Sequence, residues 1–253
     1  MKIIGLDIAT TSGWASLDDG QLSDYGSIQL NGNMDLPQRL HYFHLELIRL
    51  LDRIQPEWCF IEDVILGISG AKTLSYLARL NGVAINSCFG HLQQRVKLYE
   101  PTFWKKNSFD NINGHAKKWQ IQLAAVKHFN IQIVGNFEEI QNIIEEQYLN
   151  LSNIKTDIQN KRTDVNKVKA SIVRKRKPLS EIEKDEAKKK QKELELYIVK
   201  MKKALKTTET EFDKKMVKIS TDISAQTGIT PDIADACGIA ICGWKEINEN
   251  LCS

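Results

Sequence analysis

Residues 144 to 219 carry the pattern that most limits how this chain can fold, a repeat of apolar side chains every seven positions. The repeat comes in two stretches, separated by RKRKPLSEIE at residues 174–183. Sustained heptads of this kind are typical of long helices that pack along one seam. The apolar positions are Ile144, Leu151, Ile154, Ile158, Val165, Val168 and Ile172, followed by Leu194, Ile198, Met201, Leu205, Phe212 and Ile219.

The break between the two stretches predicts that the chain turns back on itself. Pro178 would end the first helix, and Ser180 with Glu183 matches a capping box that would begin the second. The two arms are of similar length, so we expect an antiparallel coiled-coil hairpin. At 1.5 Å per residue, arms of about 35 residues would reach about 50 Å.

Charge divides the chain in the same way. Residues 145–220 contain 21 Lys and Arg against 13 Asp and Glu, a net of +8, whereas the remaining residues carry 14 against 19, a net of −5. A basic insert suggests a polyanionic partner, although a long solvated helix that uses Lys for solubility accounts for the count equally well. The sequence thus predicts an inserted hairpin at residues 139–220 and a body formed by residues 1–138 and 221–253.

The body reads as alternating strands and helices. A strand meander comes first, followed by strands that alternate with helices, which predicts an α/β sheet with helices on both faces. We expect strands at residues 3–9, 13–17, 21–30, 57–62 and 95–100, a short β-like stretch at 131–135, and helices at 36–54, 71–86, 115–129 and 231–248.

Composition favours a cytoplasmic protein. No run of about 18 apolar residues indicates a membrane span, and MKIIGLDIA lacks the pattern of a signal peptide. The five cysteines are odd in number and form no CxxC pair, so we expect them to be reduced and to form no zinc site.

One acidic residue lies within an apolar strand and another ends one. Asp7 lies within IGLDIATTSGWA, residues 4–15, where an isolated carboxylate is costly unless a positive group or a metal meets it. Glu62 ends the strand FIE. Taken alone, Glu62 could be an ordinary acid at a strand end.

Two further acids lie in TPDIADACGIAIC. Asp232 falls in the first turn of a helix that begins at Pro231, where it could simply offset the helix dipole. Asp235 shares a stripe with Ile239 and Cys242 and should therefore face the sheet. If all four acids converge, hard divalent cations such as Mg²⁺ or Mn²⁺ would relieve their repulsion. A pair of such ions can promote phosphodiester cleavage.

Five motifs in order resemble those of the RuvC family of Holliday-junction resolvases: IGLDIATTSGWA, FIEDV, ARLNGVAI, GHAKKWQIQ and DIADACGIAIC. The resemblance spans about residues 1–135 and 222–253 and excludes the heptads. It implies an RNase H-like fold and a homodimer that hydrolyses DNA at four-way junctions, leaving 5′-phosphate and 3′-hydroxyl ends. It also implies that Asp7, Glu62, Asp232 and Asp235 are catalytic acids that bind Mg²⁺, with two ions per site.

The resemblance also suggests residues that contact DNA. Lys118 matches a DNA-contacting lysine of the family, at the start of a helix whose free N–H groups favour a phosphate. Lys117, Lys105 and Lys106 are its expected companions, although all four could be plain surface lysines. Ile65 stands where known members carry an aromatic wedge, and an aliphatic wedge can also unstack bases.

The helix at residues 71–86 would supply the dimer face in the family. It carries the small residues Ala71, Ala78, Gly82 and Ala84 after Gly70, which could equally serve packing on the sheet. Three rival functions remain open at this point. They are an actin-like ATPase, since IGLDIATTSG also resembles a phosphate loop, a non-catalytic binder of branched DNA or replication complexes, and a nuclease that acts on flaps or RNA–DNA hybrids.

Overall fold

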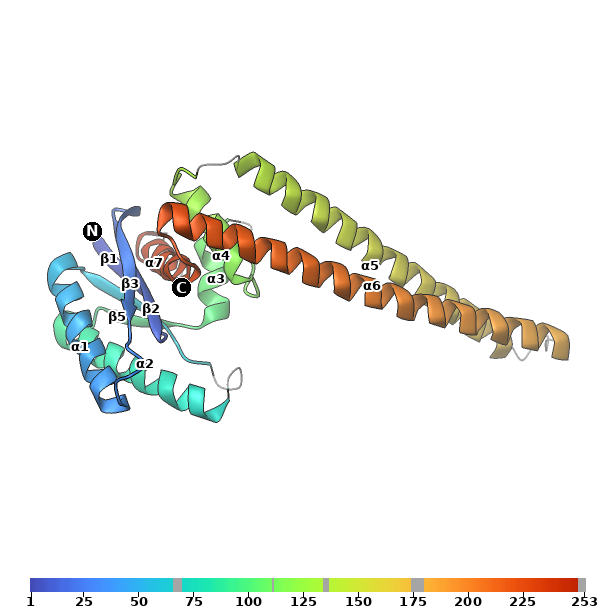
Figure 1. Ribbon diagram of the computed structural model, residues 1–253, viewed down its shortest axis with the longest axis horizontal. Helices are drawn as coiled ribbons and strands as arrows, with labels where there is room; N and C mark the ends of the chain where they lie inside the picture. The colour runs from blue at the N-terminus through green and yellow to red at the C-terminus, as the bar shows by residue number, and fades with distance from the viewer. Residues whose placement is uncertain (66–69, 111, 134–136, 174–179, 250–253) are drawn as a thin grey trace. The chain divides into compact units, whose positions relative to one another are not determined.

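The computed structural model describes residues 1–65, 70–110, 112–133, 137–173 and 180–249. The chain separates into two compact units (Figure 1). Residues 1–134 and 219–253 form the first, which we call the body unit, and residues 135–218 form the second, which we call the helical unit.

A five-stranded sheet is the centre of the body unit, with the strand order β3-β2-β1-β4-β5. The first three strands form an antiparallel meander, and β4 and β5 run parallel to β1. This strand order, with helices on both faces, is that of an RNase H-like α/β fold, as the resemblance implied. The strands are β1 (Lys2–Asp7), β2 (Thr11–Asp18), β3 (Gln21–Gln29), β4 (Trp58–Glu62) and β5 (Val96–Tyr99).

Helices cover both faces because alternate residues of each strand are apolar on opposite sides. On one face, Ile3 and Phe60 pack in a core with residues of α3, α4 and α7. On the other, Ile4 and Ile61 pack against α1 and α2. The helices of the body unit are α1 (Leu36–Ile54), α2 (Ala71–Leu92), α3 (Pro101–Ser108), α4 (Lys118–His128) and α7 (Pro231–Glu249).

Two glycines let α7 lie directly on the sheet. A Cβ atom at Gly5 would come within 2.3 Å of the Ala236 carbonyl oxygen, and one at Gly13 within 2.2 Å of the Asp232 carbonyl oxygen. No side chain fits at such distances, so glycine is required for this approach. The close contact fixes the height and register of α7 above β1 and β2.

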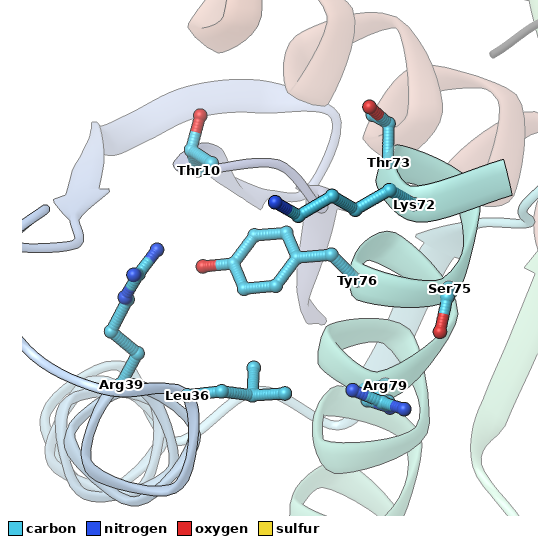
Figure 2. Close-up of a pocket in the computed structure, with 8 residues that line it drawn as sticks. All are labelled: Thr10, Leu36, Arg39, Lys72, Thr73, Ser75, Tyr76 and Arg79. Carbon is cyan, nitrogen blue, oxygen red and sulfur yellow. The ribbon is translucent and has the colours of Figure 1, made fainter. Parts of the chain in front are cut away.

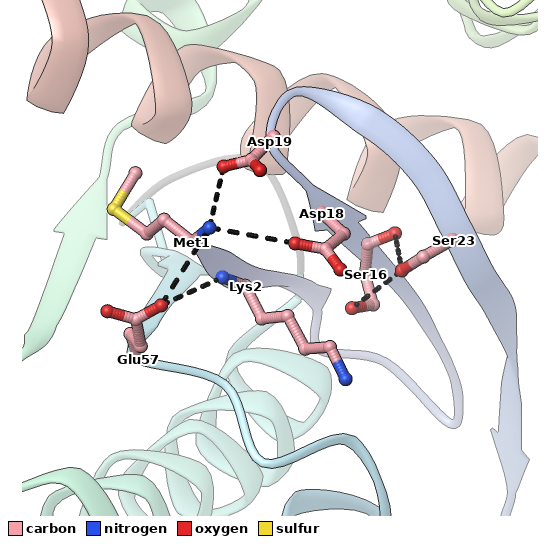
Figure 3. Close-up of polar contacts among 7 residues, drawn as sticks. All are labelled: Met1, Lys2, Ser16, Asp18, Asp19, Ser23 and Glu57. Carbon is pink, nitrogen blue, oxygen red and sulfur yellow. Dashed lines mark hydrogen bonds and ion pairs between the residues drawn. The ribbon is translucent and has the colours of Figure 1, made fainter.

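The opposite end of β1 is held by charged groups (Figure 3). The amino group of Met1 lies 2.6 Å from a carboxylate oxygen of Asp19 and 3.6 Å from one of Asp18. The backbone N–H of Lys2 donates to Glu57. Asp19 has a φ of 47° and Gly20 a φ of 80°, which makes the tight turn that DDG predicts between β2 and β3.

The helical unit consists of two long helices that run side by side in opposite directions (Figure 1). They are α5 (Phe137–Val173) and α6 (Glu181–Thr227), the end of which belongs to the body unit. Ile158, Val165 and Ile198 form a buried seam between them. The ion pairs Lys155–Glu209 and Lys169–Glu195, both 3.2 Å, link the helices. The later residue of α5 pairs with the earlier residue of α6, as expected for antiparallel helices.

The sequence misplaces two helix boundaries and misses one short helix. The helix expected at 115–129 begins at Lys118, because the Asn113 side chain accepts from His115 N–H and its carbonyl from Ala116 N–H, which forms a turn first. The helix expected at 71–86 continues to Leu92. The short helix α3 was not expected.

The β-like stretch expected at 131–135 is also wrong where the structure describes it. Residues 131–133 have no regular structure, and residues 134 and 135 lie outside the described part. Asn130 has a φ of 49°, and the N–H of Ile131 donates to the Val126 carbonyl, so this segment completes the end of α4 instead of joining the sheet.

Two further expectations can be compared with the structure. The four described cysteines, Cys59, Cys88, Cys237 and Cys242, are buried and form no disulfide with one another, and Cys252 lies outside the described residues. None of the helices in the described part is long and apolar enough to cross a membrane.

Candidate active site

Asp7 and Glu62 lie at the same edge of the sheet. Asp7 is the last residue of β1 and Glu62 the last residue of β4. These parallel strands pair Leu6 with Ile61, so the next residue of each strand emerges beside the other. The alternation along the strands turns both carboxylates toward the face that α7 covers.

The first turn of α7 brings the other two acids to this edge. The hydroxyl of Thr230 accepts from the Ile233 N–H at 3.3 Å and caps the helix. The backbone of Asp232 rests on Gly13, which pairs with Asp7 across β1 and β2. Asp235 follows one turn later and is only 4% exposed. The predicted stripe on α7 therefore does face the sheet.

The buried acids influence one another electrostatically. Burial raises the pKa of Asp7 well above its usual range, and the charges of Glu62 and Asp235 raise it further. Burial raises the pKa of Asp235 to about 7, despite the opposing charge of Lys118. Burial likewise raises the pKa of Glu62. Three carboxyl groups that resist ionisation together form one coupled cluster.

Lys118 supplies the positive charge that these acids lack. It forms an ion pair with Asp232, and its ammonium nitrogen lies 3.6 Å from a carboxylate oxygen of Asp235. Partial burial alone would lower the pKa of Lys118, but the carboxylates of Asp235, Asp232 and Asp7 outweigh this and raise it. Lys118 thus lies against the acids, where the sequence predicted only a contact with DNA.

Glu62 is held by a tryptophan. The indole Nε1–H of Trp104 donates to Glu62 Oε2 at 2.8 Å, and the side chain of Asn81 donates to the Glu62 carbonyl at 2.8 Å. The Trp104 ring is fully buried and lies so close to Gly238 of α7 that a Cβ there would be 2.6 Å away. This packing fixes the direction of the N–H group and with it the Glu62 carboxylate.

The chemistry of the four side chains fits a divalent cation. Asp235 Oδ1 is buried and accepts no hydrogen bond within the described part of the chain. A cation would satisfy an oxygen in that position, and carboxylates are the ligands that Mg²⁺ and Mn²⁺ prefer. Among the described residues, no three His, Cys, Asp or Glu side chains lie close enough to hold one ion. Asp232 and Asp235 instead lie against the ammonium group of Lys118, and Glu62 accepts the hydrogen bond from Trp104.

The other predicted DNA contacts lie around this edge. Lys105, on α3, is close enough to lower the pKa of Glu62 and Asp235, and its ammonium lies 5.3 Å from the Trp104 ring centroid. Lys106 is exposed on the same helix, and Lys117 is exposed just before α4. Ile65 follows β4, half-buried, next to residues 66–69, which lie outside the described part.

Sequence reasoning missed the roles of Trp104 and Asn81. Trp104 is fully buried, and a buried indole usually has a hydrogen-bond acceptor. That rule could have raised the question of which acid the indole meets. No comparable signal marks Asn81, since ARLNGVAI gives no indication of where an amide would bond.

Comparison with known proteins finds several relatives. No family model matches the chain. A crossover junction endodeoxyribonuclease RuvC of Magnetococcus marinus is 33% identical over 34% of this chain and 49% of its own length, so that match spans about half of the relative. The protein of the same name from Ehrlichia canis is 30% identical over 54% of this chain and 88% of its own length. That of Nitrobacter hamburgensis is 33% identical over 48% and 72%.

Solved structures give weaker similarities. A Thermus thermophilus RuvC structure has a TM-score of 0.43 and 18% identity, over 54% of this chain and 84% of that one. The T. thermophilus RuvC in complex with a Holliday junction substrate has a TM-score of 0.45 and 14% identity, over 54% and 83%.

Proposed function

The chain belongs to the family of RuvC crossover junction endodeoxyribonucleases, and from this premise we propose that it is a metal-dependent endonuclease that resolves four-way DNA junctions. The products would be strands with 5′-phosphate and 3′-hydroxyl ends. Cleavage would occur at the edge of the sheet that carries Asp7 and Glu62, with Asp232 and Asp235 supplied by the start of α7.

One observation carries this proposal more than any other. A buried carboxylate oxygen of Asp235 has no hydrogen-bond donor among the described residues, beside two more acids whose pKa values are raised by burial. Such a cluster costs the fold free energy when it ionises. A cation that binds there would offset that cost. Uncompensated buried carboxylates are therefore expected in a cation site and not in a structural core.

The four carboxylates would hold divalent cations, Mg²⁺ or Mn²⁺. When bound, a pair of such ions activates the attacking water and stabilises the leaving oxygen of the phosphodiester. Trp104 would keep the Glu62 carboxylate pointing at the site through its 2.8 Å hydrogen bond. Lys118 and Lys105 would then offer their charges to the phosphate group of the DNA, because charge-assisted contacts to phosphate are strong.

The first experiment uses a synthetic four-way junction with Mg²⁺, beside a flap, an RNA–DNA hybrid and a linear duplex of the same sequence. We expect paired cuts on opposite strands of the junction and ends that a DNA ligase reseals. Preferential cleavage of the flap or the hybrid would assign a different substrate. Binding without cleavage over a full Mg²⁺ and Mn²⁺ titration would favour the non-catalytic binder, and ATP hydrolysis by the purified chain would favour the ATPase.

The matched variants are Asp7→Asn and Asp222→Asn. Asp7→Asn should abolish cleavage and leave junction binding unchanged or improved, because it removes a ligand and also a negative charge near the DNA. Asp222 is exposed on α6 in the body unit and should be dispensable. Full cleavage by Asp7→Asn would contradict the assignment of the acids.

For the lysines, Lys117→Ala with Lys118→Ala should weaken junction binding. In a plot of log affinity against log salt concentration, each lost phosphate contact reduces the magnitude of the slope by about one unit. The double variant should therefore reduce it by up to about two. An unchanged slope would mean that neither lysine contacts a phosphate.

For the helical unit we propose an inserted coiled-coil hairpin that clamps DNA. The net charge of +8 over residues 145–220 supports this, as do the buried seam and the ion pairs between the two helices. Replacing residues 140–220 with a short Gly/Ser linker should leave a folded body of net charge near −5 that binds junctions more weakly. If junction affinity is kept and the solution mass changes instead, the hairpin serves assembly.

A homodimer that uses α2 as its face completes the proposal. Ala71, Ala78 and Gly82 are exposed on this helix, and a Cβ at Gly82 would meet no atom within 4 Å, so a close helix approach is sterically open. Ala84 is buried and serves the sheet instead. The solution mass of the full chain tests this directly, and a strictly monomeric protein would contradict it.

A further inference from the structure

An open pocket of about 680 Å³ lies between the first turns of α1 and α2 and the loop that follows β1 (Figure 2). These two helices cover the face of the sheet opposite to α7, so the pocket is separate from the four carboxylates. Its volume is in the range of sites that hold small organic groups. The function proposed above makes no use of it.

The lining of the pocket is positively charged. Arg39, Lys72 and Arg79 contribute to it, and none of the lining residues is acidic. Within the described part of the chain, none of these three cations takes part in a salt bridge. Like charges around one pocket repel one another, and an anion between them removes that repulsion.

A hydroxyl group in the pocket also lacks a partner. Tyr76 Oη is buried and has no hydrogen bond within the described residues. The guanidinium of Arg39 lies 5.6 Å from the centroid of the same ring, and its Nε–H donates to the Met34 carbonyl at 2.7 Å, which anchors the side chain. Figure 2 shows the Arg39, Lys72 and Tyr76 polar groups pointing into one space, with the Thr10 hydroxyl nearby.

The pocket lies at the same end of β1 as the carboxylates. Thr10, which lines it, follows Asp7 by three residues, so their Cα atoms are at most about 11 Å apart. That upper limit is within the length of about two or three nucleotides of a DNA strand. A strand that reaches Asp7 can therefore continue over the loop between β1 and β2 to the pocket.

We propose that the pocket binds the phosphate of a nucleotide a few positions along the DNA from the one at Asp7, with Arg39, Lys72 and Tyr76 as the contacting groups and Arg79 adding charge at the rim. This inference rests on the proposed function for the identity of the strand. A free nucleotide presents the same phosphate chemistry, so the experiment has one arm for each source. Arginine and lysine supply the charge, and the Tyr76 hydroxyl supplies a directional hydrogen bond.

The DNA arm measures junction affinity by fluorescence anisotropy in the Asp7→Asn background, so that no cleavage occurs. Lys72→Ala with Arg79→Ala should weaken binding about tenfold or more and reduce the log–log salt slope by up to about two units. Tyr76→Phe should weaken binding a few-fold without changing the slope, because no charge is lost. The control is Lys2→Ala, an exposed lysine at the opposite end of β1.

The free-ligand arm measures thermal stabilisation of the full chain by inorganic phosphate and by a deoxyribonucleoside monophosphate. Stabilisation that disappears in the Lys72→Ala, Arg79→Ala variant, together with unchanged junction affinity, would assign the pocket to free nucleotides and overturn the DNA assignment. If all pocket variants match the Lys2→Ala control in both arms, there is no phosphate site.

Failure of the pocket can be distinguished from failure of the proposed function. Cleavage of the four-way junction is measured separately on the chain with Asp7 intact. A chain that cuts no junction but binds DNA in a manner that depends on Tyr76 and Lys72 would retain the pocket and lose the nuclease. A chain that cuts junctions and whose pocket variants bind normally would retain the nuclease and lose the pocket.

Discussion

Removing the charge of Asp235 should stabilise the protein in the absence of divalent cations. The side chain is 4% exposed, and its Oδ1 accepts no hydrogen bond among the described residues. Burial raises its pKa to about 7, with the charge of Glu62 adding to the effect and that of Lys118 opposing it. Asp235→Asn keeps the shape of the side chain and removes the charge that burial opposes.

The magnitude follows from the pKa. The unfolded chain has an Asp pKa of about 4, so the folded state loses stability relative to the unfolded state as the pH rises from about 4 to about 7. Each pKa unit of difference between the folded and unfolded states changes the free energy of unfolding by about 1.4 kcal/mol. Ionised Asp235 therefore destabilises the folded state by at most about 4 kcal/mol above pH 7, of which about 3 kcal/mol develops between pH 5 and pH 8. For a unit of this size, that change corresponds to about 6–12 °C in Tm.

The assay is urea unfolding in EDTA at about pH 5 and about pH 8, followed by tryptophan fluorescence. All five tryptophans (Trp14, Trp58, Trp104, Trp119 and Trp244) lie in the body unit, so the signal reports that unit alone. Asp222→Asn is the control for the loss of one exposed acid. Saturating Mn²⁺ should reverse the order at about pH 8, because a ligand stabilises only the state that binds it.

The reasoning would be refuted by a pH-independent difference between Asp235→Asn and the parent protein. It would also be refuted if Asp235→Asn were less stable than the parent protein at about pH 8 in EDTA. That result would mean that other groups of the folded protein stabilise the Asp235 carboxylate charge.

Three other substitutions test the surrounding structure. Trp104→Phe removes the hydrogen bond that lowers the pKa of Glu62, so the acid limb of the cleavage–pH profile should move to higher pH; an unmoved limb would mean that the bond has no role in cleavage. Gly13→Ala should cost about 1–3 kcal/mol in urea unfolding because its Cβ would meet the backbone of α7, whereas Gly90→Ala, where the Cβ meets no atom within 4 Å, should stabilise by about 0.5–1 kcal/mol. Lys118→Met should raise the affinity for Mn²⁺ several-fold, on the order of tenfold, in calorimetry without DNA, since it removes the ammonium group that contacts Asp232 and Asp235; an equal or lower affinity would show that Lys118 does not compete with the cation.

Local signals predicted the elements whose boundaries depend on local chemistry. The helix expected at 36–54 has those bounds, because Asp35 and Gln38 form a capping box and Pro37 fits the first turn. Ser180 and Glu183 likewise form the predicted capping box. The start of α4 was predicted three residues too early because Asn113 forms a hydrogen-bonded turn before the helix. A short polar turn of this kind replaces the first helical turn, and it has no apolar periodicity from which it could be predicted.

The acids were easier to predict than their partners. Asp7 lies in an apolar run, Glu62 ends an apolar strand, and Asp235 shares a stripe with Ile239, so the burial of these acids was visible in the sequence, although the strand of Asp7 was expected to continue to residue 9 and ends at Asp7. The pairing of Lys118 with Asp232 joins residues 114 positions apart, and only the packing of α4 on α7 brings them together. Tertiary contacts of this kind leave no trace in local spacing.

The order of elements along the chain has a consequence for biosynthesis. About 100 residues separate the end of α4 from the start of α7, so at ordinary elongation rates the ribosome needs roughly 5–20 s to cross them. During that time the nascent chain carries Asp7 and Glu62 but neither acid of α7, and one apolar face of its sheet is uncovered. Until α7 emerges, the nascent chain therefore lacks half of the predicted site, and the part of the sheet that α7 covers stays exposed.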